Sequence, residues 1–189
     1  MTVLVTYASK HGSTRGIAEA IATTLGDHGV GTEVLPVDDV GDLGSYDAVV
    51  LGSAIHVGRW LKQATEFARR HRAVLTERPL WLFSSGPLGT DVVDDEEQPR
   101  ELAELRGTLA PRDHRLFYGA LTKDELGFGE RMIVKAVKAP EGDFRDWNEI
   151  RAWAATIADE LRSAGAPSPS TTTASAAGEG RLHTPEGRP

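Results

Sequence analysis

Short apolar stretches alternate with helical patterns along most of the chain, and this alternation is the feature that most constrains the fold. The stretches are rich in apolar and β-branched residues, as strands buried on both faces are. Between them, apolar residues recur every three or four positions, as on one face of a helix. Strands that alternate with helices are joined by right-handed crossovers and form a parallel sheet covered on both faces. We therefore expect an α/β fold with five strands, at residues 3–8, 32–37, 48–55, 80–85 and 115–121.

The last helical pattern is the clearest one in the chain. Its apolar residues repeat at intervals of three or four, which predicts a helix that closes the fold by packing on the sheet. These residues are Trp147, Ile150, Ala154, Ile157 and Leu161. Beyond them Pro, Ser, Thr and Gly are frequent and no hydrophobic period remains. We expect residues 1–165 to form one domain and residues 166–189 to form a disordered tail.

The segment that joins the first strand to the first helix has the composition of an anion site. It reads Tyr-Ala-Ser-Lys-His-Gly-Ser-Thr-Arg from Tyr7 to Arg15. A helix N-terminus presents unpaired N–H groups and a positive dipole end, and the hydroxyls add donors, so a phosphate fits here. The Walker A and Gly-x-Gly-x-x-Gly patterns are both absent, which argues against a nucleotide triphosphatase and a classical dinucleotide enzyme. The alternative is that these serine and threonine residues only cap the helix.

Small residues follow two further expected strands. The third strand ends in residues 52–59, and the fourth ends in residues 84–89. In an open parallel sheet, ligands bind outside the carboxyl ends of the strands. Glycine and serine there permit a flat polar ring to approach the backbone, although each segment alone could be an ordinary turn. Three such segments at three strand ends predict one cleft.

The composition excludes several classes of function. With 26% charged residues and a net charge of −7, the chain lacks the surplus of Lys and Arg that nucleic-acid binding requires. Without cysteine it can form neither a disulfide nor a thiolate metal site. We interpret the acidic run at 91–97 as a solvated loop and expect no metal site. No apolar run approaches the ~20 residues of a membrane span, and we expect a cytoplasmic protein.

Residues 122–140 interrupt the alternation between the last strand and the last helix. Apolar residues there fit one side of a short helix, with Arg131, Lys135 and Lys138 elsewhere. Such a helix can lie on the core. Its basic residues also suit a partner or the negatively charged inner face of a membrane, which would make the protein peripheral.

Four segments carry a resemblance to a known family. They are Tyr-Ala-Ser-Lys-His-Gly-Ser-Thr at 7–14, Gly-Ser-Ala-Ile-His-Val-Gly at 52–58, Phe-Ser-Ser-Gly-Pro at 83–87 and Lys-Ala-Pro-Glu-Gly-Asp-Phe-Arg-Asp-Trp at 138–147. Over residues 1 to about 163 the chain resembles the flavodoxin-like FMN proteins. Within them it is most similar to the menaquinone-dependent protoporphyrinogen IX dehydrogenase family, which acts in haem biosynthesis.

The resemblance implies a flavodoxin-like, three-layer doubly wound fold with a five-stranded parallel sheet in the order 2-1-3-4-5. It also implies an FMN cofactor. The phosphate of FMN would be held by Ser9, His11, Gly12, Ser13 and Thr14. The isoalloxazine ring would lie between two groups of residues: Ser53, Ala54, Ile55, His56, Val57 and Gly58 in one, and Ser84, Ser85, Gly86, Pro87 and Leu88 in the other.

Several nearby residues have two interpretations. Trp60 could lie near the ring, or it could pack in the core, since it falls on an apolar helical face. His56 could contact the flavin or a substrate, or it could hydrogen-bond within its loop. Asp143, Arg145 and Asp146 are interpreted as capping and surface-pair residues, with a substrate role left open by the resemblance.

The sequence favours an FMN-dependent oxidoreductase that oxidises a flat donor, protoporphyrinogen IX if the resemblance holds, with a quinone as acceptor. Residues 84–89 contain no aromatic side chain to cover the ring, which leaves room for a flat substrate. No residue is assigned as a catalytic acid or base, since the protein's part in flavin chemistry is to hold and tune the ring. The alternatives are an electron-transfer flavodoxin that docks to redox proteins, and a domain that has lost its cofactor.

Overall fold

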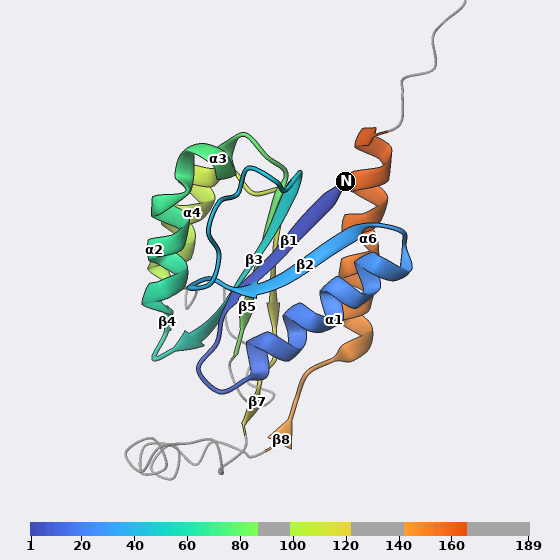
Figure 1. Cartoon of the computed structure of the whole chain (residues 1–189). Helices are drawn as coiled ribbons and strands as arrows, with labels where there is room; N and C mark the ends of the chain where they lie inside the picture. The colour runs from blue at the N-terminus through green and yellow to red at the C-terminus, as the bar shows by residue number, and fades with distance from the viewer. Residues whose placement is uncertain (87–98, 122–141, 166–189) are drawn as a thin grey trace, which may run out of the picture.

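The computed structural model describes residues 1–86, 99–121 and 142–165, which form a parallel sheet between two layers of helices (Figure 1). The predictions for residues 91–97, 122–140 and 166–189, and those for Pro87 and Leu88, fall outside the described residues. The elements, in chain order, are β1 (Thr2–Ala8), α1 (Ser13–Asp27), β2 (Gly31–Pro36), β3 (Ala48–His56), β4 (Arg59–Trp60), α2 (Lys62–Arg70), α3 (Arg72–Thr76), β5 (Leu80–Ser85), α4 (Arg100–Leu109), β6 (Asp113–Phe117), β7 (Ala120–Leu121), β8 (Gly142–Asp143) and α6 (Trp147–Gly165).

The strand order of the main sheet is β2-β1-β3-β5-β6, with every neighbouring pair parallel. The short β4 pairs antiparallel with β3 and stands apart from this path. Counting only the five long strands, the order is 2-1-3-4-5, and the predicted flavodoxin-like topology is confirmed. The order in which the chain adds strands to the sheet reverses between β1 and β3. Folds of this class bind their ligands at such a point.

The fifth expected strand, at residues 115–121, is divided in the structure. Its first part, β6, pairs with β5 as far as Phe117, which lies opposite Ser85 at the end of β5. Beyond that point β5 offers no further partner. The chain therefore leaves the sheet, and β7 pairs antiparallel with β8 instead. Figure 1 shows β7 and β8 beyond the carboxyl end of the sheet, near the start of α1.

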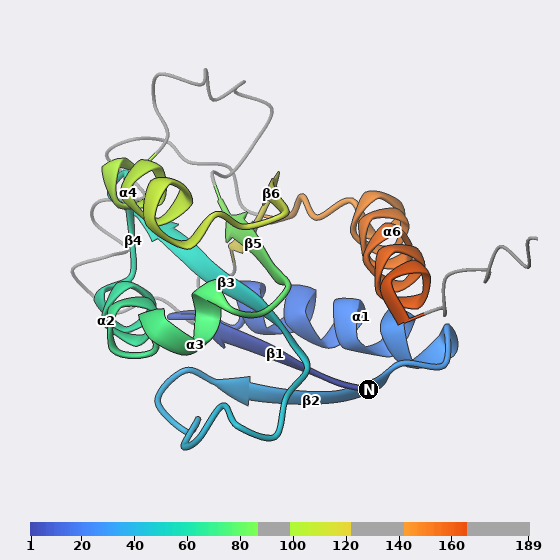
Figure 2. The ribbon, with the colours of Figure 1, turned by 90° about the horizontal axis from the view of Figure 1, so that it is seen from above.

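Two hydrophobic cores lie on the two faces of the sheet. The strands alternate between them, so Trp81 and Phe83 pack under α1 and α6, whereas Leu80 and Leu82 pack under α2, α3 and α4. Figure 2 shows these helices in their two layers. The strand period of two therefore determines on which face of the sheet each side chain of β5 packs.

The last helix matches its prediction. Ile150, Ala154, Ile157 and Leu161 are all buried in the core beneath α6. The carboxylate of Asp146 caps the helix by accepting the N–H groups of Asn148 (2.9 Å) and Glu149 (3.0 Å). No helix within the described ranges is both long and apolar enough to span a bilayer.

Candidate functional site

The turn from β1 into α1 has the backbone geometry of an anion cradle. Gly12 precedes the helix in the left-handed conformation, with φ of 74°, and no side chain caps this end. The interpretation of these residues as simple helix caps is therefore wrong. The first helical hydrogen bond runs from the Gly16 N–H to the Gly12 carbonyl (3.0 Å). The N–H groups of the first turn precede this bond and point out of the helix toward the loop.

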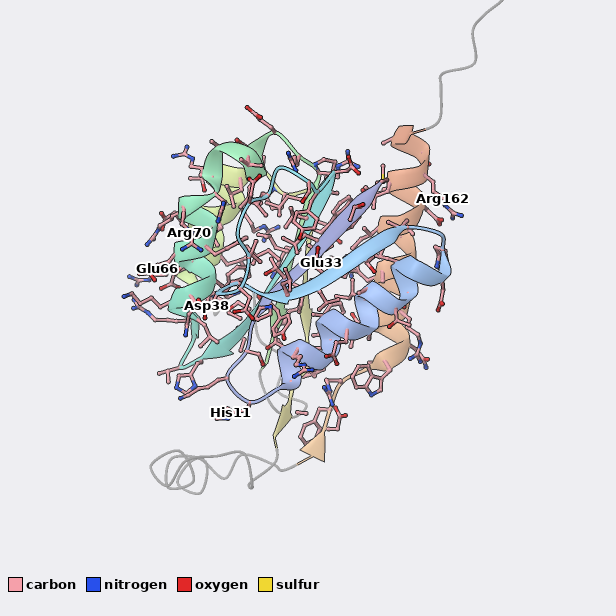
Figure 3. All side chains as sticks on the ribbon, in the orientation of Figure 1. His11, Glu33, Asp38, Glu66, Arg70 and Arg162 are labelled. Atoms are coloured by element: carbon pink, nitrogen blue, oxygen red, sulfur yellow. The ribbon has the colours of Figure 1, made fainter. Side chains whose placement is uncertain are left out.

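Two hydroxyls of the turn are buried and have no partner. Among the described residues, four buried side-chain polar atoms lack a hydrogen-bond partner, and Ser9 Oγ and Thr14 Oγ1 are two of them. A buried hydroxyl without a partner costs about 1–3 kcal/mol. A phosphate would accept from both hydroxyls and from the first-turn N–H groups, and thereby remove this penalty. The residues present thus fit the phosphate of FMN. His11 lies in the same loop, beyond the end of β1 (Figure 3).

The hydroxyl of Ser13 has protein partners. Its oxygen accepts the N–H of Ala120 in β7 (2.9 Å) and lies 3.4 Å from the Ser85 hydroxyl at the end of β5. The sequence suggested a phosphate donor at this hydroxyl. In the structure its oxygen joins the start of α1 to two other chain segments, and a hydroxyl that accepts one hydrogen bond keeps its own hydrogen for a further acceptor.

Arg145 reaches the same helix end from the segment before α6. Its Nη1 donates to the Ser13 carbonyl (3.3 Å), and its guanidinium lies 4.3 Å from the centroid of the Trp147 ring. Two hydrogen bonds of 2.7 Å join it to the Asp143 carboxylate and hold the pKa of that carboxyl below its usual value. A Cβ on Gly16 would stand 2.6 Å from Arg145 Nη1, so glycine provides the room for this contact. The expected pairing of Asp143 with Arg145 is confirmed, although the Arg145 side chain is only 16% exposed.

The β3–β4 hairpin forms one wall of the site. Its tip is Val57 and Gly58, with φ of 51° and 68°, as in the type I′ turns that join tightly twisted strands. The Val57 side chain is 83% exposed. Such a backbone conformation is strained for a β-branched residue. His56, Ile55 and Ala54 precede the tip in β3, and the first of them is exposed.

The polar residues beneath this wall are used within the protein. The Ser53 hydroxyl accepts the Leu61 N–H (3.0 Å), and the buried Ser84 hydroxyl accepts the Trp60 indole N–H (2.8 Å). Trp60 lies in β4 and not on the expected helical face, but it is only 4% exposed, and its interpretation as a core residue is confirmed. His114 Nε2 lies 3.0 Å from the Ser84 hydroxyl on its other side. These two serines therefore position the wall from within the protein.

The carboxyl ends of β3, β5 and β6 meet at Gly86. Its φ is 112°, and its N–H donates to the Phe117 carbonyl (3.0 Å). A Cβ on Gly86 would stand 3.5 Å from the Ile55 carbonyl, and a Cβ on Gly119 would stand 3.6 Å from the Gly86 Cα. The predicted segments after the first, third and fourth strands thus lie at one edge of the sheet.

Sequence reasoning missed Ala120 as part of this region. Ala120 lies 107 positions from Ser13 along the chain, and Arg145 lies 132 positions from Ser13. No local spacing rule connects residues so far apart. Within the described ranges, no three potential metal ligands come together.

Comparisons with known proteins identify the family and the fold. Residues 4–148 match the family described as flavodoxin domain. Among curated proteins, the chain is similar to the protoporphyrinogen IX dehydrogenase (quinone) of Escherichia coli strain K12, with 23% identity over 172 residues, 84% of this chain and 95% of that protein.

Solved structures give the same fold. One is a flavodoxin from the domain Archaea, with 18% identity and a TM-score of 0.58, covering 86% of this chain and 99% of that one. Another is the oxidised Flavodoxin 1 of Bacillus cereus, with 15% identity and a TM-score of 0.55, covering 85% and 99%.

Proposed function

Because the chain belongs to the flavodoxin domain family, we propose that it is an FMN-dependent oxidoreductase that oxidises protoporphyrinogen IX or a similar flat donor and uses a quinone as acceptor. FMN is the cofactor of this family. The observation that carries the proposal is the pair of buried, unpartnered hydroxyls of Ser9 and Thr14 beside the N-terminus of α1. The choice of donor and acceptor is supported by the similarity to the E. coli dehydrogenase.

Each part of the site has a proposed task. The first-turn N–H groups of α1 and the hydroxyls of Ser9 and Thr14 bind the phosphate, with Gly12 allowing the backbone to curve around it. The tip of the β3–β4 hairpin and the Ser85–Gly86 segment orient the ring between them. When bound, FMN would supply the electron-transfer chemistry, and the protein would hold and tune the ring.

The second candidate is an electron-transfer flavodoxin without a substrate of its own. The net charge of −7 favours it, because an acidic surface suits docking to a basic redox partner. This candidate shares the cofactor and the fold with the first. It differs in that a small donor would not reduce the bound flavin.

One experiment separates these candidates. The visible spectrum of the purified protein is recorded without oxygen, before and after addition of FMN, then with protoporphyrinogen IX and then with a soluble menaquinone analogue. The dehydrogenase is expected to show flavin bands that bleach with the donor and return with the quinone. Bound flavin that ignores the donor would favour the electron carrier, and failure to bind FMN would refute both.

A further inference from the structure

Three side chains from three strands form a hydrogen-bonded series beneath the hairpin. The Trp60 indole N–H in β4 donates to Ser84 Oγ in β5 (2.8 Å), and Ser84 Oγ lies 3.0 Å from His114 Nε2 in β6. Trp60 and Ser84 are buried. Ser84 follows Leu82 on the sheet face covered by α2, α3 and α4, and the series therefore lies opposite the Ser13–Ser85 contact under α1.

The chemistry of a hydroxyl sets the direction of this series. Ser84 has one hydrogen and two acceptor sites, and Trp60 can only donate. Ser84 therefore uses its own hydrogen best by donating to His114 Nε2, which requires a neutral imidazole with its proton on Nδ1. This tautomer is inferred from the hydrogen-bond pattern. His114 is the final acceptor of the series, and the series fixes the position of the Trp60 indole.

The surroundings of His114 keep it neutral. Burial and the positive charge of Arg106 on α4 lower its pKa to about 4, against the opposing effect of Asp113 on its own strand. Protonation would place a hydrogen on Nε2 and remove the acceptor that Ser84 needs. Near neutral pH this does not occur, and the series is intact.

Trp60 is the buried anchor of the hairpin. The β4 strand has two residues, and only the pairs Ile55 with Trp60 and His56 with Arg59 join it to β3. The ion pair from Arg59 to Glu101 is long, at 3.5 Å, and its arginine is exposed, although its carboxylate is largely buried. The left-handed Val57 at the tip works against the hairpin. The position of the tip thus depends on the buried indole, together with the hydrogen bond from the Leu61 N–H to Ser53 Oγ (3.0 Å).

We propose that His114 is a positioning residue for the flavin ring: through Ser84 and Trp60 it sets where the Val57–Gly58 tip stands at the site. The inference rests on the proposed function, since the ring is what the tip would contact. It assigns no role to His114 in holding the phosphate, because the cradle lies at the start of α1, on the other sheet face. Ring binding and phosphate binding should therefore respond differently to a change at His114.

The test compares His114→Leu with His114→Gln, in which the amide oxygen can again accept from Ser84. Ser84→Ala breaks the series without adding volume, and it replaces His114→Leu in the test if that variant does not fold. His71→Leu is the matched control, since His71 is a partly buried histidine whose ring lies tilted against Phe67 and whose Nε2 accepts from Arg70 (3.2 Å). Each full-length protein is titrated with FMN and with riboflavin, which lacks the phosphate, and its flavin midpoint potential is measured.

His114→Leu is expected to weaken FMN and riboflavin binding by the same factor, about tenfold, as the loss of roughly one hydrogen bond implies. It should also shift the midpoint potential, and His114→Gln should largely restore both. In a Trp60→Phe background the effect of His114→Leu should disappear, because the two residues act through one series. The Trp60 indole N–H resonance of the apoprotein should move in His114→Leu and in Ser84→Ala, but not in His71→Leu.

Unchanged riboflavin affinity and potential in His114→Leu and Ser84→Ala, with stability alone reduced, would overturn the positioning role. A loss of FMN affinity without a loss of riboflavin affinity would also overturn it, because the effect would then lie at the phosphate. If the wild-type protein binds neither flavin, the proposed function fails, and this inference fails with it. If the wild-type protein binds FMN and riboflavin and the variants bind them equally well, the positioning role of His114 is refuted and the proposed function still stands.

Discussion

Replacing Thr14 by valine should move apoprotein stability and FMN affinity in opposite directions. The Thr14 side chain is fully buried in α1, and its hydroxyl has no partner. Valine has nearly the same shape and a similar helix propensity. The substitution therefore removes one polar atom and leaves the packing in place.

The expected magnitudes follow from that atom. A buried hydroxyl without a partner costs about 1–3 kcal/mol, so the apoprotein should gain roughly 1–2 kcal/mol in its free energy of unfolding. A hydroxyl that donates to a charged phosphate contributes about 1.5–3 kcal/mol, and its loss should raise the Kd for FMN roughly 10- to 150-fold.

Two measurements on the same variant test this reasoning. Urea unfolding of the apoprotein, followed by circular dichroism, gives the stability change. Quenching of flavin fluorescence on titration gives the Kd. Thr24→Val is the matched control, because Thr24 is also buried in α1 but its hydroxyl already donates to the Ala20 carbonyl (2.9 Å). It should leave the Kd for FMN unchanged.

A Thr14→Val apoprotein that is less stable than the wild type would show that the hydroxyl has a partner within the folded chain. An FMN Kd within twofold of the wild-type value would show that Thr14 does not contact the phosphate. Either result would refute the cradle as described.

Three further predictions concern the sheet and the hairpin. Gly52→Ala should destabilise the protein by about 3 kcal/mol in urea unfolding, since its Cβ would stand 2.0 Å from the Phe83 ring. Val57→Asn should stabilise it by about 1 kcal/mol, because asparagine tolerates the left-handed conformation; a loss of stability would contradict this. The pKa of folded His114, about 4, lies below its unfolded value. The unfolded state therefore binds more protons between these values, and stability should fall by about 2 kcal/mol from pH 7 to pH 5. His114→Gln should lack this part of the pH dependence, and an unchanged slope would count against the shifted pKa.

The fold could be predicted because its signals are local. The central strands β1, β3 and β5 are largely buried on both faces and read as continuous apolar runs, such as the one from Ala48 to Leu51. The stripe of α6 is regular enough to identify from spacing alone. The division of the fifth strand was missed because it depends on where a neighbour ends, which is Ser85 in β5.

The site was predicted less well, because the role of a serine depends on where its hydroxyl points. Ser84 and Ser85 are adjacent, yet the strand period sends one toward Trp60 and the other toward Ser13. Residue type alone treats them alike. Ser9 and Thr14 differ from Ser13 only in lacking partners, and that difference depends on Ala120, far away in the sequence.

The two-residue ribbon of β7 and β8 has a consequence for evolution. Leu121 pairs with Gly142, so the two ends of the segment that joins these strands lie side by side. Closing a longer segment at such a point adds only about 0.6 kcal/mol for each doubling of its length. Lineages can therefore lengthen, shorten or exchange what lies between Leu121 and Gly142 while the sheet and the cradle keep their residues. Sequence length among relatives should vary more here than at the β1–α1 turn, where Gly12 admits little change.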